Sequence, residues 1–103
     1  MKVIVDYAGR QVRLTDERLR HILEHPEMAG METAMVETVG QPQLVVQSSS
    51  DETASLFYRH YLATKVGDKW LCVVVKYQVD DAFVLTAYLT DQPKKGLTQW
   101  PNT

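Results

Sequence analysis

The sequence contains a single cysteine, Cys72, and no long apolar run. One cysteine cannot form an internal disulfide, and it excludes a metal site built from several thiolates. No apolar stretch approaches the roughly 20 residues that a membrane-spanning helix needs. The first residues, MKVIVDYAGRQ, contain only a short apolar stretch and no A-x-A site, so they do not resemble a signal peptide. We therefore expect a cytoplasmic protein without a membrane partner.

An excess of positive charge is also lacking. The 11 Lys and Arg residues face 13 Asp and Glu residues, which gives a formal net charge of −2. This balance argues against extended, charge-driven binding to nucleic acid, although it leaves room for a local basic patch. Because 103 residues fit one compact domain and 45% of them are hydrophobic, we expect a single globular domain over residues 1–103.

Helix signals follow a short N-terminal strand. Thr15 is a good N-cap, and the acidic residues after it suit the positive end of a helix dipole. Pro26 disfavours helical geometry at His25 and should end this first helix. A second helix is predicted from about residue 28 to 39, and Gly40 follows it. The expected order is a strand and turn, two helices, a sheet and a polar tail, at residues 1–14, 15–40, 42–90 and 91–103.

The periodicity changes after Pro42, from helical spacing to runs of aromatic and β-branched residues. Four strands are predicted, in the segments QLVVQ, SLFYRHYLA, KWLCVVVKYQ and AFVLTAYLT. Helices followed by adjacent strands predict an α+β fold, in which two N-terminal helices pack on one face of a four-stranded antiparallel sheet. A short N-terminal strand or hairpin precedes them. The other face of the sheet would then stay free for function.

His21, Glu24 and His25 match the pattern H-x-x-E-H, which raises the question of a zinc site. On one helix, both imidazoles would reach the same ion. Against this, the helix must stop at Pro26, and the only other histidine for a third ligand is His60, on a strand of unknown facing. We therefore expect no metal and no cofactor. The remaining interpretations make the pair surface and capping residues, or make one of them a general acid or base.

Several segments together resemble one family. The stretches LTDERLRHILEHPEM, LFYRHY, WLCVVVKYQVDDAFVLTAYLT and the trailing KKG are similar to small phage and cyanobacterial-type domains of the barnase–EndoU–colicin–RelE nuclease superfamily. The resemblance covers residues 12 to 96 and implies a two-helix, four-stranded antiparallel fold that cleaves RNA without a metal. It also implies that a helix histidine, a strand arginine or lysine, and a hydroxyl residue surround one phosphate. The matching positions are His21 or His25, Arg59 or Lys76, and Thr86 or Tyr88.

The chemistry of metal-free RNA cleavage needs such a trio. A base must take the 2′-hydroxyl proton, an acid must protonate the leaving 5′-oxygen, and a cation must stabilise the charge on phosphorus. His21 is the favoured acid or base, because histidine exchanges protons near neutral pH. Arg59 would grip the phosphate with two parallel hydrogen bonds, whereas Lys76 would act as a point charge. The remaining candidates would orient the phosphate, stack a base or contact RNA: Thr86, Tyr88, Tyr58, Tyr61, Lys94 and Lys95.

Strand parity decides which of these side chains can meet. In the last strand, Thr86 and Tyr88 share one face, which we expect to point away from the helices. The opposite, more apolar face carries Phe83, Leu85, Ala87 and Leu89. A two-residue hairpin turn would put Lys76 on the helix side, and only an odd-numbered loop or a bulge brings it beside Thr86. Arg59 shares a face with Tyr61, but the sequence leaves the direction of that face open.

The leading prediction is a metal-independent endoribonuclease-like domain that cleaves RNA by acid–base catalysis. One alternative is a non-catalytic domain of the same fold that binds RNA or a protein, and the acidic charge balance favours it. A zinc hydrolase that uses the HILEH motif is the third interpretation. The expected partners are RNA and, for a toxin-like protein, a neutralising protein.

Overall fold

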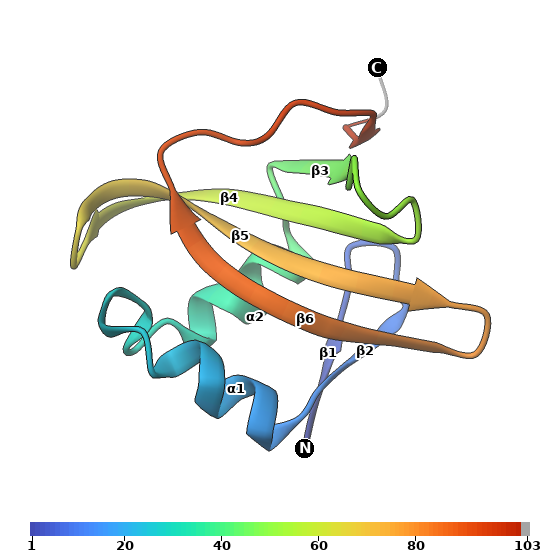
Figure 1. Ribbon diagram of the computed structural model, residues 1–103, viewed down its shortest axis with the longest axis horizontal. Helices are drawn as coiled ribbons and strands as arrows, with labels where there is room; N and C mark the ends of the chain where they lie inside the picture. The colour runs from blue at the N-terminus through green and yellow to red at the C-terminus, as the bar shows by residue number, and fades with distance from the viewer. Residues whose placement is uncertain (102–103) are drawn as a thin grey trace.

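The structure is a computed structural model that describes residues 1–101. The chain begins with two short strands, continues through the helices and ends with five strands (Figure 1). The bounds are β1 Lys2–Val5, β2 Gln11–Leu14, α1 Asp16–Leu23, the 3₁₀ helix η1 Pro26–Met28, α2 Glu32–Gly40, β3 Leu44–Gln47, β4 Ala54–Thr64, β5 Gly67–Gln78, β6 Asp81–Thr90 and β7 Thr98–Trp100.

The strands form one sheet in the order β1-β2-β6-β5-β4-β3-β7. Neighbours are antiparallel except β2 and β6, which run parallel and pair only at Arg13 and Phe83. The predicted four-stranded antiparallel sheet is therefore wrong, because the sheet has seven strands and is mixed. The four predicted strands form its centre, as β3 to β6. The N-terminal strand was also predicted, as β1, but its inclusion in the sheet was not. The prediction missed β7 and did not define β2, because both are too short to show a clear alternation.

Capping and proline set the bounds of the helices. Thr15 precedes α1, and its Oγ1 accepts a hydrogen bond from the backbone N–H of Arg18 at 3.1 Å, which confirms the predicted N-cap. The helix ends before Pro26, as expected. α2 begins at Glu32, later than predicted, because η1 intervenes and Gly30 has a positive φ of 78°. Within residues 1–101, no helix is long and apolar enough to cross a membrane.

The main core lies between the helices and one face of the sheet, called the helix side from here on. The helical segment supplies Ile22, Met28, Met35 and Val39, each at most 3% exposed. These residues hold α1 against β6, and α2 against β1, β4 and β5. The sheet contributes Ile4, Val12, Leu14, Val45, Phe57, Leu71, Val73, Val75, Ala82, Val84 and Ala87.

The C-terminal segment covers part of the opposite face of the sheet. Residues 91–97 run from the end of β6 to the outer edge of β3, where β7 pairs (Figure 1). On this path the backbone N–H of Lys94 donates a hydrogen bond to Tyr58 Oη at 3.0 Å. Tyr58 and Cys72, which lie on this face, are fully buried. The expectation that the whole second face is free is therefore wrong.

A bulge in β6 determines which of its side chains point to which face. Only two residues join β5 to β6, since Gln78 pairs with Asp81. The register then shifts, because Val75 pairs with Val84 whereas Val74 pairs with Thr86. One residue of β6, Leu85, is therefore extra.

Because of the bulge, the predicted alternation of side chains along the last strand is wrong for the residues before Leu85 and right for those after it. Phe83 was expected on the same face as Ala87, but Ala82 and Val84 occupy the helix side before the bulge, so Phe83 points the other way. Beyond the bulge, Ala87 faces the core and Thr86 points away from it, as predicted. Lys76 pairs with Phe83 and shares the face of Thr86, the outcome expected for a bulged hairpin.

Gly96 lies where the C-terminal segment approaches β3, and the space around it predicts how a substitution there changes the stability of the protein. A Cβ at this position would lie 2.7 Å from Val46 Cγ1 and 3.0 Å from the carbonyl oxygen of Gln47. We predict that Gly96→Ala lowers the free energy of unfolding by about 1–3 kcal/mol, because the segment must move away from β3. Urea unfolding measures this change.

Gly40→Ala is the matched control. A Cβ at Gly40 would meet only the carbonyl oxygen of Val5 at 3.4 Å, an ordinary contact, and alanine favours the helix. Its free energy of unfolding should equal or exceed that of the wild type. Equal stability of Gly96→Ala and wild type would contradict the close packing of the C-terminal segment.

Candidate functional site

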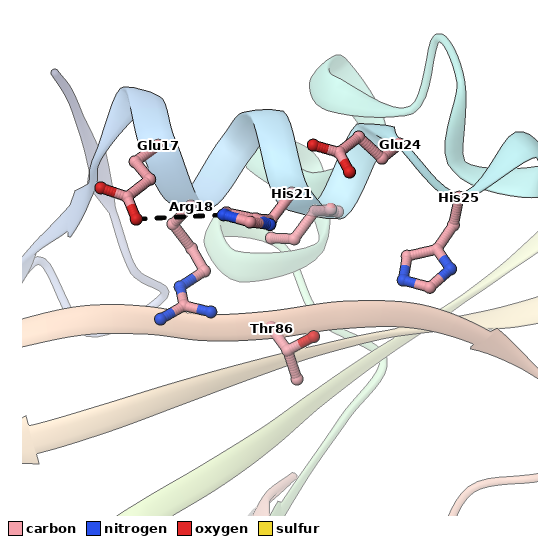
Figure 2. A pocket seen from close by; sticks show the side chains of 7 residues that line it. Glu17, Arg18, His21, Glu24, His25 and Thr86 are labelled. Carbon is pink, nitrogen blue, oxygen red and sulfur yellow. Dashed lines mark ion pairs between the residues drawn. The ribbon is translucent and has the colours of Figure 1, made fainter.

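A groove lies between α1 and the middle of β6, and its volume is about 470 Å³. Figure 2 shows that the side chains of Arg18 and His25 extend toward β6, on either side of Thr86. The lining of the α1–β6 groove thus includes a guanidinium, two imidazoles and, on the face of β6 that is turned away from the helices, the Thr86 hydroxyl. Its lining residues are Glu17, Arg18, His21, Ile22, Glu24, His25 and Thr86.

The local sequence explains how this groove arises. Ile22 is 3% exposed and anchors α1 in the core. Arg18 and His21 are three positions apart, so they project from neighbouring points on the flank of the helix. β2 pairs with β6 only at Phe83, so no strand among residues 1–101 pairs with the rest of that edge. α1 lies beside this open edge.

The charges in the groove are mixed. His21 Nε2 lies 3.9 Å from Glu17 Oε1, four residues earlier on α1. Their side chains are 56% and 77% exposed, so the pair is weak and screened by solvent. Among residues 1–101, no carboxylate forms an ion pair with Arg18. Its guanidinium therefore remains available to an anion.

The H-x-x-E-H pattern does not lie on one continuous helix. α1 ends at Leu23, and His25 is extended, with φ of −70° and ψ of 124°, because Pro26 follows it. His60 packs against Trp70, with ring centroids 5.1 Å apart. In the part of the chain that the structure describes, no group of three His, Cys, Asp or Glu side chains is arranged to hold a metal ion.

Arg59 and Tyr61 lie on the helix side, where they join β4 to α2. Arg59 Nε is 3.3 Å from Glu37 Oε1, and Arg59 Nη1 donates to the carbonyl oxygen of Gln41 at 2.7 Å. Tyr61 Oη donates to Glu37 Oε1 at 2.6 Å. Burial raises the pKa of Tyr61 to about 12, and its hydrogen bond lowers the pKa of Glu37. The structure therefore does not bring Arg59 or Tyr61 to His21.

Lys76 shares the face of Thr86 but is paired elsewhere. Its Nζ lies 2.5 Å from Asp51 Oδ2, in the loop between β3 and β4. Asp51 Oδ1 also accepts from the Thr53 hydroxyl at 2.6 Å and from the Thr53 backbone N–H at 3.0 Å. The hydrogen bond from Lys76, followed by those from Thr53, lowers the pKa of Asp51 to about 2. Lys76 thus holds the β3–β4 loop in place.

The remaining candidates belong to the face that the C-terminal segment partly covers. Tyr58 is fully buried, so it presents no ring face to a base. Tyr88 is half-buried beside Cys72. Burial raises the pKa of Tyr58 to about 12 and also raises the pKa of Tyr88. Lys94 and Lys95 are exposed on the C-terminal segment, and neither lines the groove.

Sequence reasoning gave no functional role to Arg18, and to Glu17 only a role at the start of the helix, although both line the groove. A signal for Arg18 was present, because it precedes His21 by three positions and helical spacing places both on one flank. What the sequence could not show is that β6 leaves an open edge beside this flank.

No family model, curated protein or solved structure matches this chain. The groove is therefore interpreted from its own residues. The resemblance to the nuclease superfamily depends on the sequence motifs alone.

The lowered pKa of Asp51 predicts part of the response to acid. Because this pKa is about 2 in the folded protein and 3.8 ordinarily, the contribution of Asp51 to stability is complete above about pH 4 and is lost as the pH falls through 2. Asp51→Asn should be less stable than wild type at pH 7. Its melting temperature should fall less steeply between pH 4 and pH 2, as measured by circular dichroism.

Glu52→Gln is the control for this measurement, because Glu52 is exposed and no hydrogen bond joins its carboxylate to another residue in the range 1–101. Its melting curve should follow that of the wild type over the same pH range. Parallel slopes for Asp51→Asn and wild type between pH 4 and pH 2 would refute the role of the Asp51–Lys76 pair.

Proposed function

We propose that the α1–β6 groove binds the phosphodiester backbone of RNA and cleaves it without a metal ion. The observation that carries this proposal is the gathering of Arg18, His21, His25 and Thr86 around one open hollow. These residues supply the cation, the two proton-transfer groups and the hydroxyl that such cleavage needs. The motif resemblance to the barnase–EndoU–colicin–RelE superfamily supports the same chemistry, and a cytoplasmic location would provide the substrate.

In the proposed reaction, the ribose 2′-oxygen attacks phosphorus and the bond from phosphorus to the 5′-oxygen breaks. His25 takes the proton of the 2′-hydroxyl, and His21 donates a proton to the leaving 5′-oxygen. The products are a 2′,3′-cyclic phosphate and a 5′-hydroxyl. The donor role falls to His21, because Glu17 at 3.9 Å compensates the positive charge of a protonated imidazole.

In this proposal Arg18 binds the phosphate, the role that the sequence analysis assigned to Arg59. Its guanidinium has no carboxylate partner within residues 1–101 and can donate to two phosphate oxygens side by side. Thr86 is exposed, so its hydroxyl can donate to a third oxygen. Negative charge on these oxygens grows in the transition state, and fixed donors at that point lower the barrier.

A non-catalytic binding domain is the second candidate, and one observation favours it. Glu17 and Glu24 line the groove beside a single arginine, so the groove carries no net positive charge while its histidines are neutral. Such a surface suits basic side chains of a partner protein, including a neutralising partner. This candidate predicts binding without cleavage.

The catalytic proposal predicts that the purified protein cleaves single-stranded RNA in excess EDTA and leaves 2′,3′-cyclic phosphate ends. His21→Gln and His25→Gln should each lower the cleavage rate roughly a hundredfold, the scale of general acid–base catalysis. Arg18→Ala should cause a loss of about the same size, because it removes the cation from the transition state. Gel assays on end-labelled RNA measure the rates, and ³¹P NMR identifies the ends.

Arg59→Ala is the matched control, since it removes the same side chain from the helix side of the sheet. Its cleavage rate should equal that of the wild type at a temperature where both are folded. Failure of the wild type to cleave any member of a broad RNA panel would sink the catalytic proposal. So would loss of cleavage in Arg59→Ala with full cleavage in Arg18→Ala.

A further inference from the structure

The C-terminal segment and β7 cross the sheet as one unit, residues 91–101, which is called the C-terminal arm from here on. The arm starts at the end of β6 and ends at the outer edge of β3, where β7 pairs (Figure 1). In the strand order, β5, β4 and β3 lie between β6 and β7, so the arm crosses four strand spacings. Neighbouring strands lie about 4.8 Å apart, which makes this crossing about 19 Å long.

The connection from β6 to β7 is nearly extended. Through the pairs of β3, β4 and β5, Thr98 lies level with Thr86, four residues before the end of β6 at Thr90. Four strand residues measure about 13 Å, so the direct distance from Thr90 to Thr98 is about 23 Å on a flat sheet. The eight Cα–Cα steps between these residues reach at most about 26–29 Å. Because the arm also passes over the Tyr58 side chain, it has little slack.

Few contacts hold the C-terminal segment in place. Every residue of the segment except Pro93 is exposed. Between the segment and strands β3 and β4, the described residues form two hydrogen bonds. The Lys94 N–H donates to Tyr58 Oη at 3.0 Å. The Gln47 N–H donates to the Leu97 carbonyl oxygen at 2.9 Å. β7 adds a strand of three residues, and a register shift interrupts its pairing with β3. An arm with so few buried contacts detaches at a lower free energy than the whole domain unfolds.

The surface under the arm is apolar and fitted to this one segment. Val46, Tyr58 and Cys72 form a buried cluster there, and each is at most 2% exposed. The fit is closest at Gly96, where a Cβ would lie 2.7 Å from Val46 Cγ1. Detachment of the arm brings this cluster into contact with water, which is unfavourable. The segment that covers it again must have the same shape, and a second copy of this chain supplies one.

The arm has a short hinge. Before the hinge, Asp91 pairs with Lys69 of β5. After it, Lys94 already contacts β4. The hinge is therefore Gln92 and Pro93, and the proline ring fixes one of its backbone angles. If the arm is exchanged between copies, the hinge changes its conformation, whereas the contacts of the arm stay the same and are made with the other copy.

We propose that two copies of this chain exchange their C-terminal arms, so that each arm pairs with β3 and covers the Tyr58–Cys72 cluster of the other copy. A short, stretched hinge favours such an exchange, because the exchanged arm no longer has to fold back onto its own sheet. Two identical arms cover two identical surfaces, so the assembly closes as a dimer. None of the residues that line the α1–β6 groove belongs to the arm, so the exchange is independent of RNA cleavage.

Wild-type protein that is refolded from urea at graded concentrations tests the proposal. Size-exclusion chromatography with light scattering should show a dimer whose fraction rises about tenfold for a tenfold higher concentration, while the dimer is the minor species. When ¹³C-labelled and unlabelled protein are refolded together, isotope-filtered NMR should show intermolecular contacts between Gly96 and Val46. The proposal fails if no dimer forms at any concentration, or if this contact is intramolecular in the dimer.

Hinge length provides a second test. Deletion of Gln92 and Pro93 leaves six Cα–Cα steps, which reach at most about 20–22 Å and fall short of β3 of the same chain. This variant should be a dimer at concentrations at which the wild type is a monomer. Insertion of Gly-Ser-Gly-Ser after Gln92 is the matched control, and the slack it provides should lower the dimer fraction roughly tenfold or more. A monomeric deletion variant, or an insertion variant that dimerises like the wild type, would overturn the proposal.

The Cys72 thiol reports whether an arm covers the cluster, because a buried thiol reacts slowly. In the dimer of the deletion variant, a disulfide reagent should modify Cys72 at a rate within about twofold of the wild-type rate, since the arm of the other copy protects it. Rapid modification in that dimer would show a different interface and would contradict the exchange. If the deletion variant does not fold, the wild-type NMR contact and the insertion variant decide the question.

Discussion

The extra residue at Leu85 decides which face of the sheet each part of β6 serves. Before it, Ala82 and Val84 pack under the helices, and after it Ala87 does the same. Without the bulge, the alternation that turns Val84 inward would also turn Thr86 inward and bury its hydroxyl among apolar side chains, which is costly. The bulge instead leaves Thr86 exposed beside α1. The one-residue shift in the pairing of β5 with β6 thus makes Thr86 part of the lining of the α1–β6 groove.

A seven-stranded sheet exposes two faces and two edges, and the part of the chain that the structure describes has two short α-helices and one 3₁₀ helix to cover them. The helices cover one face, while the C-terminal segment crosses part of the other and β7 pairs with the β3 edge. The α1–β6 groove lies where β2 stops pairing with β6 and α1 borders the edge of that strand.

Local signals in the sequence were enough to predict α1, because Thr15 and Pro26 act through their immediate neighbours. The central strands were also predictable, since each is long or strongly apolar. Non-local features were not. Three features depend on contacts between segments that are far apart in the chain: the parallel pairing of β2 with β6, the pairing of β7 with β3, and the bulge at Leu85. Among the residues that line the α1–β6 groove, His21 and Thr86 were already candidates from their residue type, whereas Arg18 became one only from the position of β6.

The charge of the groove couples the proposed binding of phosphate to the protonation of its histidines. Arg18 carries one positive charge against two negative charges on Glu17 and Glu24, so the groove repels a phosphate while both imidazoles are neutral. One protonated histidine cancels this excess, and that is also the state in which a general acid begins its work. Under the proposed function, RNA would bind best to the form of the groove that is ready to donate a proton. With a net charge of −2 on the whole chain, long-range attraction adds little, and short-range contacts must carry recognition.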